Sequence, residues 1–279
     1  MKQKNLRFSA GLAVFFMLIA AAVLTSATYA WFTFSADTNV EPMQGSVSEG
    51  EVSLAISATQ NGTYDVTAPI TRLDNCTELL PVSTANLTSF YSASARTRDG
   101  IVALYTDATA AANTRVLHGE VYLKAQYGDA RLYFDKTNMA FSGGAQLLAS
   151  LRLGMKITGA DGEKTYFFKL DDFGGGSATA QSTIQAGANS VVSSIDANGN
   201  AAFVTDPAAA MTDYYAVMAN ETADPEAGTT PLCTMTKDTP VRVELWIYLE
   251  GCDENCLNAA QASDLSFNLA FAGVKAETA

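Results

Sequence analysis

The sequence predicts an all-β protein: an antiparallel β-sandwich of jelly-roll or Greek-key type, preceded by an N-terminal apolar signal helix. Apolar and polar residues alternate in five separate runs, Asn-Gly and Asp-Gly pairs stand between such runs, and long amphipathic helical stretches are scarce. Successive side chains of a strand point to opposite faces, so each run is expected to bury one face and expose the other. Antiparallel strands of this kind must stack as two sheets, or close into a barrel, to cover their apolar faces.

The alternating runs extend from residue 51 almost to the C-terminus. In each run, apolar residues occupy every second position, with polar, charged, small or, in two runs, aromatic residues between them. The pattern is typical of half-buried strands. The apolar members are Val52, Leu54 and Ile56; Val121, Leu123, Ala125 and Tyr127; Leu151, Leu153, Met155 and Ile157; Val241, Val243, Leu245, Ile247 and Leu249; and Leu265, Phe267, Leu269 and Phe271.

Turn residues support the same prediction. Asn-Gly and Asp-Gly pairs tolerate the positive backbone angles that tight hairpins require. Helical turns are expected only at the start of Phe141–Leu153 and within Asn255–Ala262. The pairs that lie between strand-like runs are Asn61-Gly62, Asp161-Gly162 and Asn198-Gly199, and Gly128-Asp129 is expected to join the Val121 run to Leu132–Phe134.

The chain is expected to contain one folded domain, at residues 51–279, behind a signal peptide at 1–30 and an extended segment at 31–50. Residues 171–200 are rich in Gly, Ser and Ala, and residues 206–240 contain four prolines. Such compositions indicate long surface loops within one domain.

The first thirty residues have the three parts of an export signal. Basic residues open the segment, residues 12–24 are almost purely apolar, and Thr28 and Ala30 supply the small residues that a signal peptidase reads. Cleavage after Ala30 would make Trp31 the first mature residue. The alternative is a permanent membrane anchor, because about 20 apolar residues can span a bilayer. We expect contact with a membrane only through an uncleaved leader.

Composition excludes several classes of protein. The net charge is −12, from 17 basic and 29 acidic residues, and it becomes more negative if the basic leader is removed. A nucleic-acid binder needs a basic face, so no nucleic-acid partner is expected. Charged residues are only 16% of the chain and hydrophobic residues 48%, which excludes a disordered acidic tail.

Candidate chemistry is sparse. His118 is the only histidine, without a second imidazole for a zinc site or the H-E-x-x-H pattern of zinc peptidases. Asp196–Asn200 has oxygen-bearing residues at alternate positions, but Ala201 and Pro207 stand where a calcium loop needs Gly and Glu, so a hairpin turn is favoured. Asp171-Asp172 is a weaker calcium alternative. We therefore predict no catalytic residue, metal or cofactor, and no enzyme.

Cys76, Cys233, Cys252 and Cys256 are the four cysteines. An even number in an exported chain suggests disulfides, with three possible pairings. We favour a local bridge between Cys252 and Cys256, which leaves Cys76 to pair with Cys233. Free thiols are the alternative if the organism is anaerobic.

Two aromatic residues, Trp246 and Tyr248, fall on the predicted exposed face of a strand. They are candidates for stacking on a sugar ring, which would suit an adhesin or a carbohydrate-binding module. We favour the alternative, in which they pack under a loop or a neighbouring subunit.

The junction Thr28-Tyr29-Ala30-Trp31-Phe32-Thr33 resembles the signal-peptidase site of the TasA/camelysin group, exported proteins of Gram-positive bacteria that are processed by a SipW-type peptidase. Gly50–Leu54 resembles the Gly-x-x-x-Leu segment that opens their first strand, with more residues between the two motifs, and Phe34 stands where Asp is usual. The stretches Leu245–Gly251 with Cys256, and Leu265–Phe271, resemble uncharacterised clostridial relatives. The match covers the two ends of the chain.

This resemblance implies a jelly-roll subunit of an extracellular or cell-surface fibre of biofilm matrix, with copies of itself and a signal peptidase as partners. In such fibres the mature N-terminal segment completes a sheet of the next subunit. The matching candidate donor strand runs from Trp31 to Val40 and includes Phe32, Thr33 and Phe34. Strand addition supplies main-chain hydrogen bonds as well as apolar burial. The alternative is that the segment pairs within its own domain.

Camelysin relatives also carry a metallopeptidase label. The resemblance therefore adds a secreted peptidase as a further hypothesis, although a single histidine gives that activity no matching motif in this chain.

Overall fold

The structure, a computed structural model, describes residues 39–40, 43–47, 53–96, 102–135, 138–170, 191–204, 230–253, 256 and 265–276. The chain divides into two units, Met1–Thr33 and Phe34–Ala279, and every described residue belongs to the second. The predicted leader with Thr28 and Ala30, the residues Trp31–Phe34 and the pair Asp171-Asp172 lie outside the described residues. Among the described residues, no helix has the length and apolar character needed to cross a bilayer.

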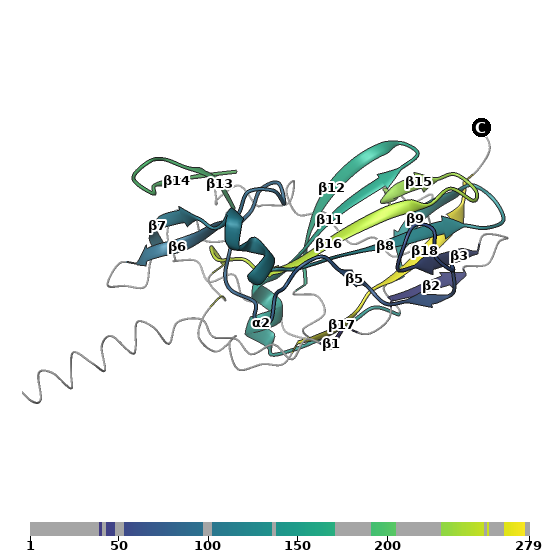
Figure 1. The fold of residues 1–279 in the computed structure, drawn as a ribbon, viewed down its shortest axis with the longest axis horizontal. Helices are drawn as coiled ribbons and strands as arrows, with labels where there is room; N and C mark the ends of the chain where they lie inside the picture. The colour runs from purple at the N-terminus through teal and green to yellow at the C-terminus, as the bar shows by residue number, and fades with distance from the viewer. Residues whose placement is uncertain are drawn as a thin grey trace, which may run out of the picture. The chain divides into compact units, whose positions relative to one another are not determined.

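The described chain is mostly β and forms several antiparallel sheets, which confirms the predicted fold class at that level (Figure 1). The larger sheet has six strands, and all of their pairings are antiparallel. In spatial order its strands are β12 (Gly162–Lys169), β11 (Leu151–Gly159), β16 (Val241–Leu249), β8 (Leu117–Ala125) and β3 (Leu54–Ser57), and β5 (Thr71–Arg72) pairs with β8 beside β3.

A five-stranded sheet and a three-stranded sheet contain the first and last strands of the described chain. In both sheets an N-terminal strand runs parallel to a C-terminal strand, β2 with β18 and β1 with β17, whereas all other pairs are antiparallel. The five-stranded order is β15 (Cys233–Met235), β9 (Ala130–Phe134), β18 (Ala270–Lys275), β2 (Met43–Val47) and β4 (Thr67–Ala68); the three-stranded order is β1 (Asn39–Val40), β17 (Ser266–Asn268) and β10 (Ala140–Ser142).

The six- and five-stranded sheets share one hydrophobic core, and we call them together the main body. The inward residues of β8 and β16 pack in the same cluster as those of β9, β15 and β18. Phe134 of β9 joins the two sheets, because its ring lies 5.1 Å edge-on from Phe168 of β12 and 5.6 Å from Phe271 of β18. Most apolar residues of the alternating runs are therefore buried as the sequence predicts, but Tyr127 is 71% exposed beyond the end of β8, and Val52 lies outside the described residues.

The outer face of the six-stranded sheet is only partly exposed. A second cluster, formed largely by residues 82–116, covers one end of this face and buries Trp246 and Tyr248. Gly154 of β11 allows the close approach of this layer: a Cβ atom at position 154 would lie 2.4 Å from Cδ2 of Leu87. The alternation of β16 accordingly stops at Leu245, after which every residue of the strand is buried.

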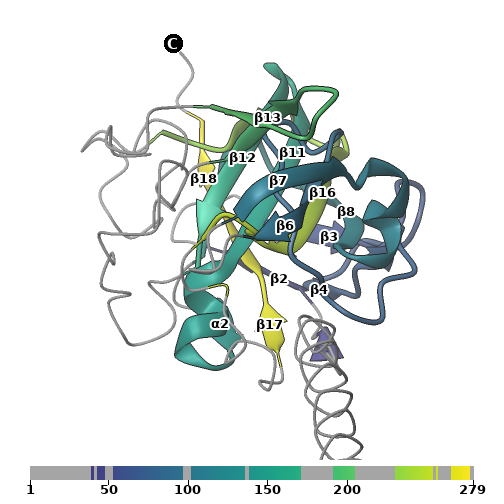
Figure 2. The same ribbon diagram turned by 90° about the vertical axis from the view of Figure 1, so that its left-hand side faces the viewer.

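Two hairpins form a further part of the fold, which we call the side module. They are β6 (Tyr91–Arg96) with β7 (Val102–Asp107), and β13 (Val192–Ile195) with β14 (Ala201–Phe203). The two hairpins lie beside each other (Figure 2), and the Tyr105 N–H donates to the Gly199 carbonyl at 2.8 Å. Their small shared core contains the buried residues Tyr105, Val192 and Cys252.

Several local predictions are confirmed. Asp161-Gly162 turns β11 into β12 and Asn198-Gly199 turns β13 into β14, with positive φ values of 99° and 86° at the two glycines. Asn61-Gly62 lies in a turn that brings Ile56 opposite Asp65. The helical turns expected near residue 141 are α2 (Ala145–Ser150), and a 3₁₀ helix, η1 (Thr109–Thr114), follows β7.

Other local predictions need correction. Gly128-Asp129 does join β8 to β9, as predicted, but the connection is not a hairpin within one sheet: the two strands belong to different sheets, so the turn carries the chain across the core. The run Leu265–Phe271 is divided between β17 and β18, which lie in different sheets. The two predicted long loops also contain strands, β13 within 171–200 and β15 within 206–240.

Candidate functional site

The candidate assembly site is formed by the N-terminal strands. β2 lies in the interior of the five-stranded sheet, with Gln44 opposite both Ala270 of β18 and Thr67 of β4. Asn39 and Val40, the two described residues of the candidate donor strand, form β1 and pair with Ser266 and Phe267 of β17. Without this segment, β18 and β4 would each lose a neighbouring strand and expose unpaired backbone groups.

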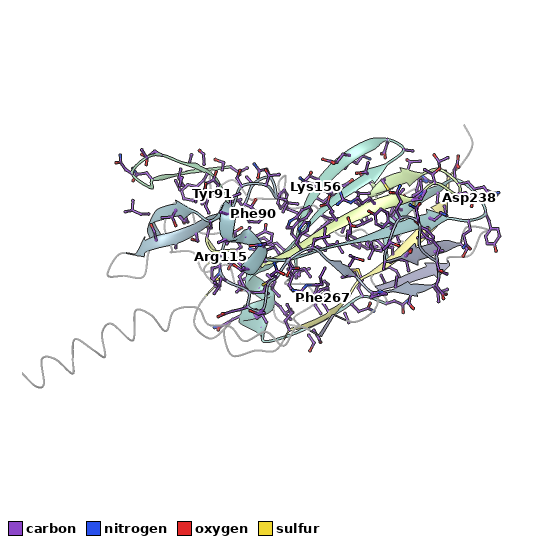
Figure 3. All side chains as sticks on the ribbon, viewed as in Figure 1. Phe90, Tyr91, Arg115, Lys156, Asp238 and Phe267 are labelled. Atoms are coloured by element: carbon purple, nitrogen blue, oxygen red, sulfur yellow. The ribbon has the colours of Figure 1, made fainter. Side chains whose placement is uncertain are left out.

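An apolar cavity of about 20 Å³ lies close to this site. Phe267 of β17 lines it from one side, and Leu245 and Ile247 of β16 line it from the six-stranded sheet. Phe267 and Lys156, labelled in Figure 3, lie on opposite faces of that sheet. The cavity is about large enough for one water molecule, and apolar side chains form most of its lining, beside Arg72 and His118.

His118 has a structural environment on the outer face of the six-stranded sheet. Its ring stacks on Trp246, with a centroid distance of 4.3 Å and an interplanar angle of 12°. Its Nε2 atom lies 3.2 Å from Oε1 of Glu244. The histidine thus packs and hydrogen-bonds across strands β8 and β16.

A ladder of ion pairs continues from His118 along the same face. Arg242 bridges two carboxylates, with Nε 2.7 Å from Oε2 of Glu120 and NH1 2.6 Å from Oε2 of Glu244. The Tyr122 hydroxyl donates to Oε1 of Glu120 at 3.3 Å. These side chains are 16–41% exposed, so each ion pair contributes about 0.2–1 kcal/mol. The two carboxylates neutralise Arg242, and the pair between Arg242 and Glu120 helps to hold β16 and β8 in register. This is a structural role.

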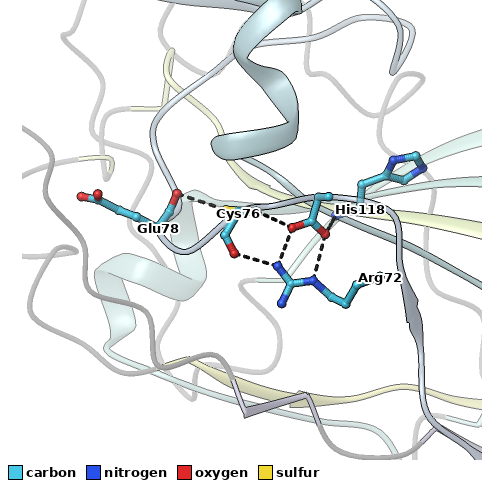
Figure 4. A network of polar contacts seen from close by, with 5 residues as sticks. Arg72, Cys76, Glu78 and His118 are labelled. Carbon is cyan, nitrogen blue, oxygen red and sulfur yellow. Dashed lines mark hydrogen bonds and ion pairs between the residues drawn. The ribbon is translucent and has the colours of Figure 1, made fainter.

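A buried carboxylate, Asp74, fixes the segment that follows β5 (Figure 4). It accepts hydrogen bonds from Nε of Arg72 at 2.9 Å, from the Cys76 N–H at 2.6 Å and from the His118 N–H at 2.8 Å. The Cys76 thiol donates to the Glu78 carbonyl at 3.1 Å. Burial raises the pKa of Cys76 to about 11, so the thiol is protonated at neutral pH and is a poor nucleophile.

The four cysteines are all buried and none of them forms a disulfide, so the predicted Cys76–Cys233 and Cys252–Cys256 bridges are not present in the structure. The separation of the local pair has a packing reason: Cys256 belongs to the core of the main body, whereas Cys252 belongs to the core of the side module. Cys233 lies in β15 opposite Leu132, and burial raises its pKa to about 12.

Trp246 and Tyr248 are not available to a sugar. Trp246 is 6% exposed and Tyr248 0%, beneath the layer that contains Leu87 and Phe90. The sugar-stacking interpretation of these two residues is therefore wrong, and the alternative in which they pack under a covering segment is confirmed.

Asp196 lies in the turn between β13 and β14, which is the structure that the sequence favours over a calcium loop. The Asp196 carboxylate accepts hydrogen bonds from the backbone N–H groups of Asn198 and Asn200 and from the Asn200 side chain, at 2.8–2.9 Å. These bonds close the β13–β14 hairpin, as predicted. Within the described parts of the chain, no group of three His, Cys, Asp or Glu side chains is placed to bind a metal ion.

Sequence reasoning missed a buried charged cluster at the end of β16. Arg152 of β11 forms an ion pair with Asp253, and Glu250 is buried beside them. All three were expected on exposed faces or in loops, because alternation places Arg152 and Glu250 outward. The signal that could have found them is indirect: these charges adjoin a stretch of β16 that is unusually apolar on both faces, at Leu245–Leu249.

Comparison of the chain with protein-family models, with curated proteins and with solved structures finds no match.

Proposed function

We propose that this protein is an exported structural subunit of an extracellular or cell-surface fibre, and that it assembles through its N-terminal strand segment. The single observation that carries the proposal is the position of β2: residues 43–47 supply an interior strand of the five-stranded sheet and run parallel to β18. The common core of the two large sheets supports a β-sandwich of jelly-roll type for the subunit.

An interior strand near the N-terminus suits exchange between copies. The same registers, Met43 with Ala68 and Gln44 with Ala270, can be made by a strand from the same chain or from another copy. Exchange of an identical element therefore costs little in contacts, and a heterologous exchange that does not close on itself extends into a fibre. The residues from Trp31 to Val40, which the TasA-like resemblance marks as the donor, directly precede β2 in the chain.

Deletion of residues 31–47 from the mature chain tests the proposal. We expect the mature chain to form fibres visible by electron microscopy, and the deletion variant to sediment as a monomer that binds a peptide of residues 31–47 added in trans. If the mature chain stays monomeric at high concentration, and the deletion changes neither assembly nor stability, the proposal fails.

A point variant separates strand loss from general damage. Gly45→Pro removes a backbone donor in β2 and should lower both assembly and thermal stability, since proline is not tolerated in an interior strand. Gly128→Ala is the matched control, because a Cβ atom at position 128 meets nothing within 4 Å. The control should assemble like the parent protein.

A further inference from the structure

The end of β16 is the point at which the side module is attached to the main body. Glu250 follows β16 and lies opposite Val82 in an isolated bridge. The Val82 N–H donates to the Leu249 carbonyl at 3.0 Å, the Gly251 N–H donates to the Val82 carbonyl at 2.9 Å, and the Glu250 N–H donates to the Ser150 carbonyl at 2.9 Å. Three hydrogen bonds thus fix the backbone around Glu250 between Val82 and Ser150.

The Glu250 side chain is fully buried. Its Oε1 atom accepts a hydrogen bond from the Cys252 N–H at 3.2 Å, while Oε2 has no hydrogen-bond partner among the described residues. Leaving a lone pair of a buried carboxylate unsatisfied is costly, and the cost is much larger for a charged carboxylate than for a neutral carboxyl group.

Among the residues that the structure describes, the charges that face Glu250 do not balance. Arg152 attracts Glu250, but the same guanidinium forms the ion pair with Asp253, which repels Glu250. Arg152 also donates to the carbonyls of Ala149 and Leu151 at 2.8 Å. One buried guanidinium therefore serves two buried carboxylates, and full ionisation would leave an excess negative charge in the interior.

The same site holds the side module in place. Ser83, next to Glu250, exchanges two backbone hydrogen bonds with Tyr91 of β6, at 2.7 and 2.9 Å, and its hydroxyl accepts from the Val192 N–H of β13 at 2.9 Å. Tyr91, labelled in Figure 3, lies at the start of β6. The Cys252 sulfur lies 3.3 Å from the Tyr105 hydroxyl of β7. Three strands of the side module thus contact residues that surround Glu250.

We propose that Glu250 is a proton-sensitive anchor: the neutral carboxyl group holds the side module on the main body, and ionisation of that group favours local opening of the module. The side module is the part expected to open, because the free energy of local opening is lowest where few apolar side chains are buried, and its core is small. Opening would hydrate the carboxylate and remove the cost of its burial.

The electrostatic environment agrees with this geometry. Burial raises the pKa of Glu250 from 4.5 to about 7, against the opposing effects of Arg152 and Ser83. Burial, followed by the charge of Glu250, also raises the pKa of the neighbouring Cys252 thiol. Cys252 therefore stays neutral around pH 7 and does not contribute to the pH dependence of opening. Asp253 raises the pKa of Glu250 in the same direction as burial.

The sign of the pH dependence follows from these values. Below pH 4.5 the carboxyl group is protonated in both the closed and the open form, so its stabilisation of the closed form is fully present. Between pH 4.5 and about 7 the closed form holds a proton that the open form lacks, and closing weakens as the pH rises. Above about pH 7 this stabilisation is lost, and the equilibrium constant for opening of the side module has increased on the order of 100-fold.

Hydrogen exchange of the mature protein between pH 5 and 8, corrected for intrinsic amide rates, measures this opening. We expect the opening equilibrium at the amides of Tyr91, Tyr105 and Val192 to rise at least 10-fold over this range, while amides of β8 and β11 in the main body change much less. In Glu250→Gln, which is neutral at every pH, the rise at the side module should disappear. Glu163→Gln removes an exposed carboxylate of β12 and is the matched control that should keep the rise.

A second measurement keeps the proposal open to refutation if Glu250→Gln does not fold. In parent protein labelled with ¹³C at glutamate side-chain carboxyls, one buried carboxyl resonance should titrate near pH 7. Titration of every glutamate near 4.5, or an equal rise in opening in the parent protein and in Glu250→Gln, would overturn the proposal. The inference concerns the folded subunit, so it does not depend on fibre assembly.

Discussion

The main body and the side module are held together by different kinds of interaction. The main body buries apolar side chains from two large sheets in one core, with Phe134 packed between Phe168 and Phe271. The side module has a core of three buried side chains and depends on polar contacts of Ser83 and Cys252. The stability that comes from apolar burial is insensitive to pH, whereas the stability of the polar attachment depends on whether Glu250 is protonated. The two regions should therefore respond to different perturbations.

The largest effect is expected in the main body. Phe134→Ala removes a ring that is 1% exposed and should lower the free energy of unfolding of the whole protein by about 3–5 kcal/mol, because a cavity remains between the sheets. Urea denaturation followed by circular dichroism measures the change. Tyr127→Ala is the control, since Tyr127 is 71% exposed and its loss should cost much less. Equal costs for the two variants would contradict a core shared by the sheets.

A polar substitution should act on the side module alone. Ser83→Ala leaves the buried Val192 N–H without its acceptor, which should weaken closing of the module by about 1–3 kcal/mol. Hydrogen exchange should accelerate at Tyr91, Tyr105 and Val192, with little change in β8. Ser194→Ala, at an exposed neighbouring position of β13, is the control. A uniform loss of protection in both regions would show that they open as one unit.

The layer over Trp246 lies between the two regions and should show an intermediate response. Gly154→Ala places a methyl group against the Leu87 side chain and should destabilise the protein by about 1–2 kcal/mol through overpacking. Leu87→Ala makes room for that methyl group, so the double variant should cost less than the sum of the two single variants. Strict additivity in this double-mutant cycle would mean that the two positions do not touch.

Alternation predicted the main body well because one face of each strand is buried against the other sheet. It predicted β8 and β16 at nearly the observed positions, and the Asp161-Gly162 and Asn198-Gly199 turns fixed two hairpins. These signals are local, and the structure agrees with them because no contact with a distant segment changes the strands and turns that they predict.

The remaining features depend on contacts between distant segments. The parallel pairing of β2 with β18 joins residues more than two hundred positions apart, and no local pattern specifies it. Burial of Trp246 requires a covering layer from residues 82–116, a stretch in which the alternation is weak. Glu250 and Arg152 read as exposed positions of their strands, and only the covering layer makes them a buried charged cluster.

The smallest effect is expected on the exposed half of the outer face, where charges are paired in water. Arg242→Gln breaks the bridge between Glu120 and Glu244, both of which remain partly exposed, so the loss of stability should be about 0.2–1 kcal/mol. The loss should shrink further in high salt, because salt screens exposed charges. Arg152→Gln makes the matching change in the buried cluster, and it should cost several-fold more and show little dependence on salt. Urea denaturation of both variants at low and high salt measures the contrast. Equal costs and equal salt dependence would mean that the buried cluster is as hydrated as the surface ladder, and the proton-sensitive anchor would then lose its physical basis.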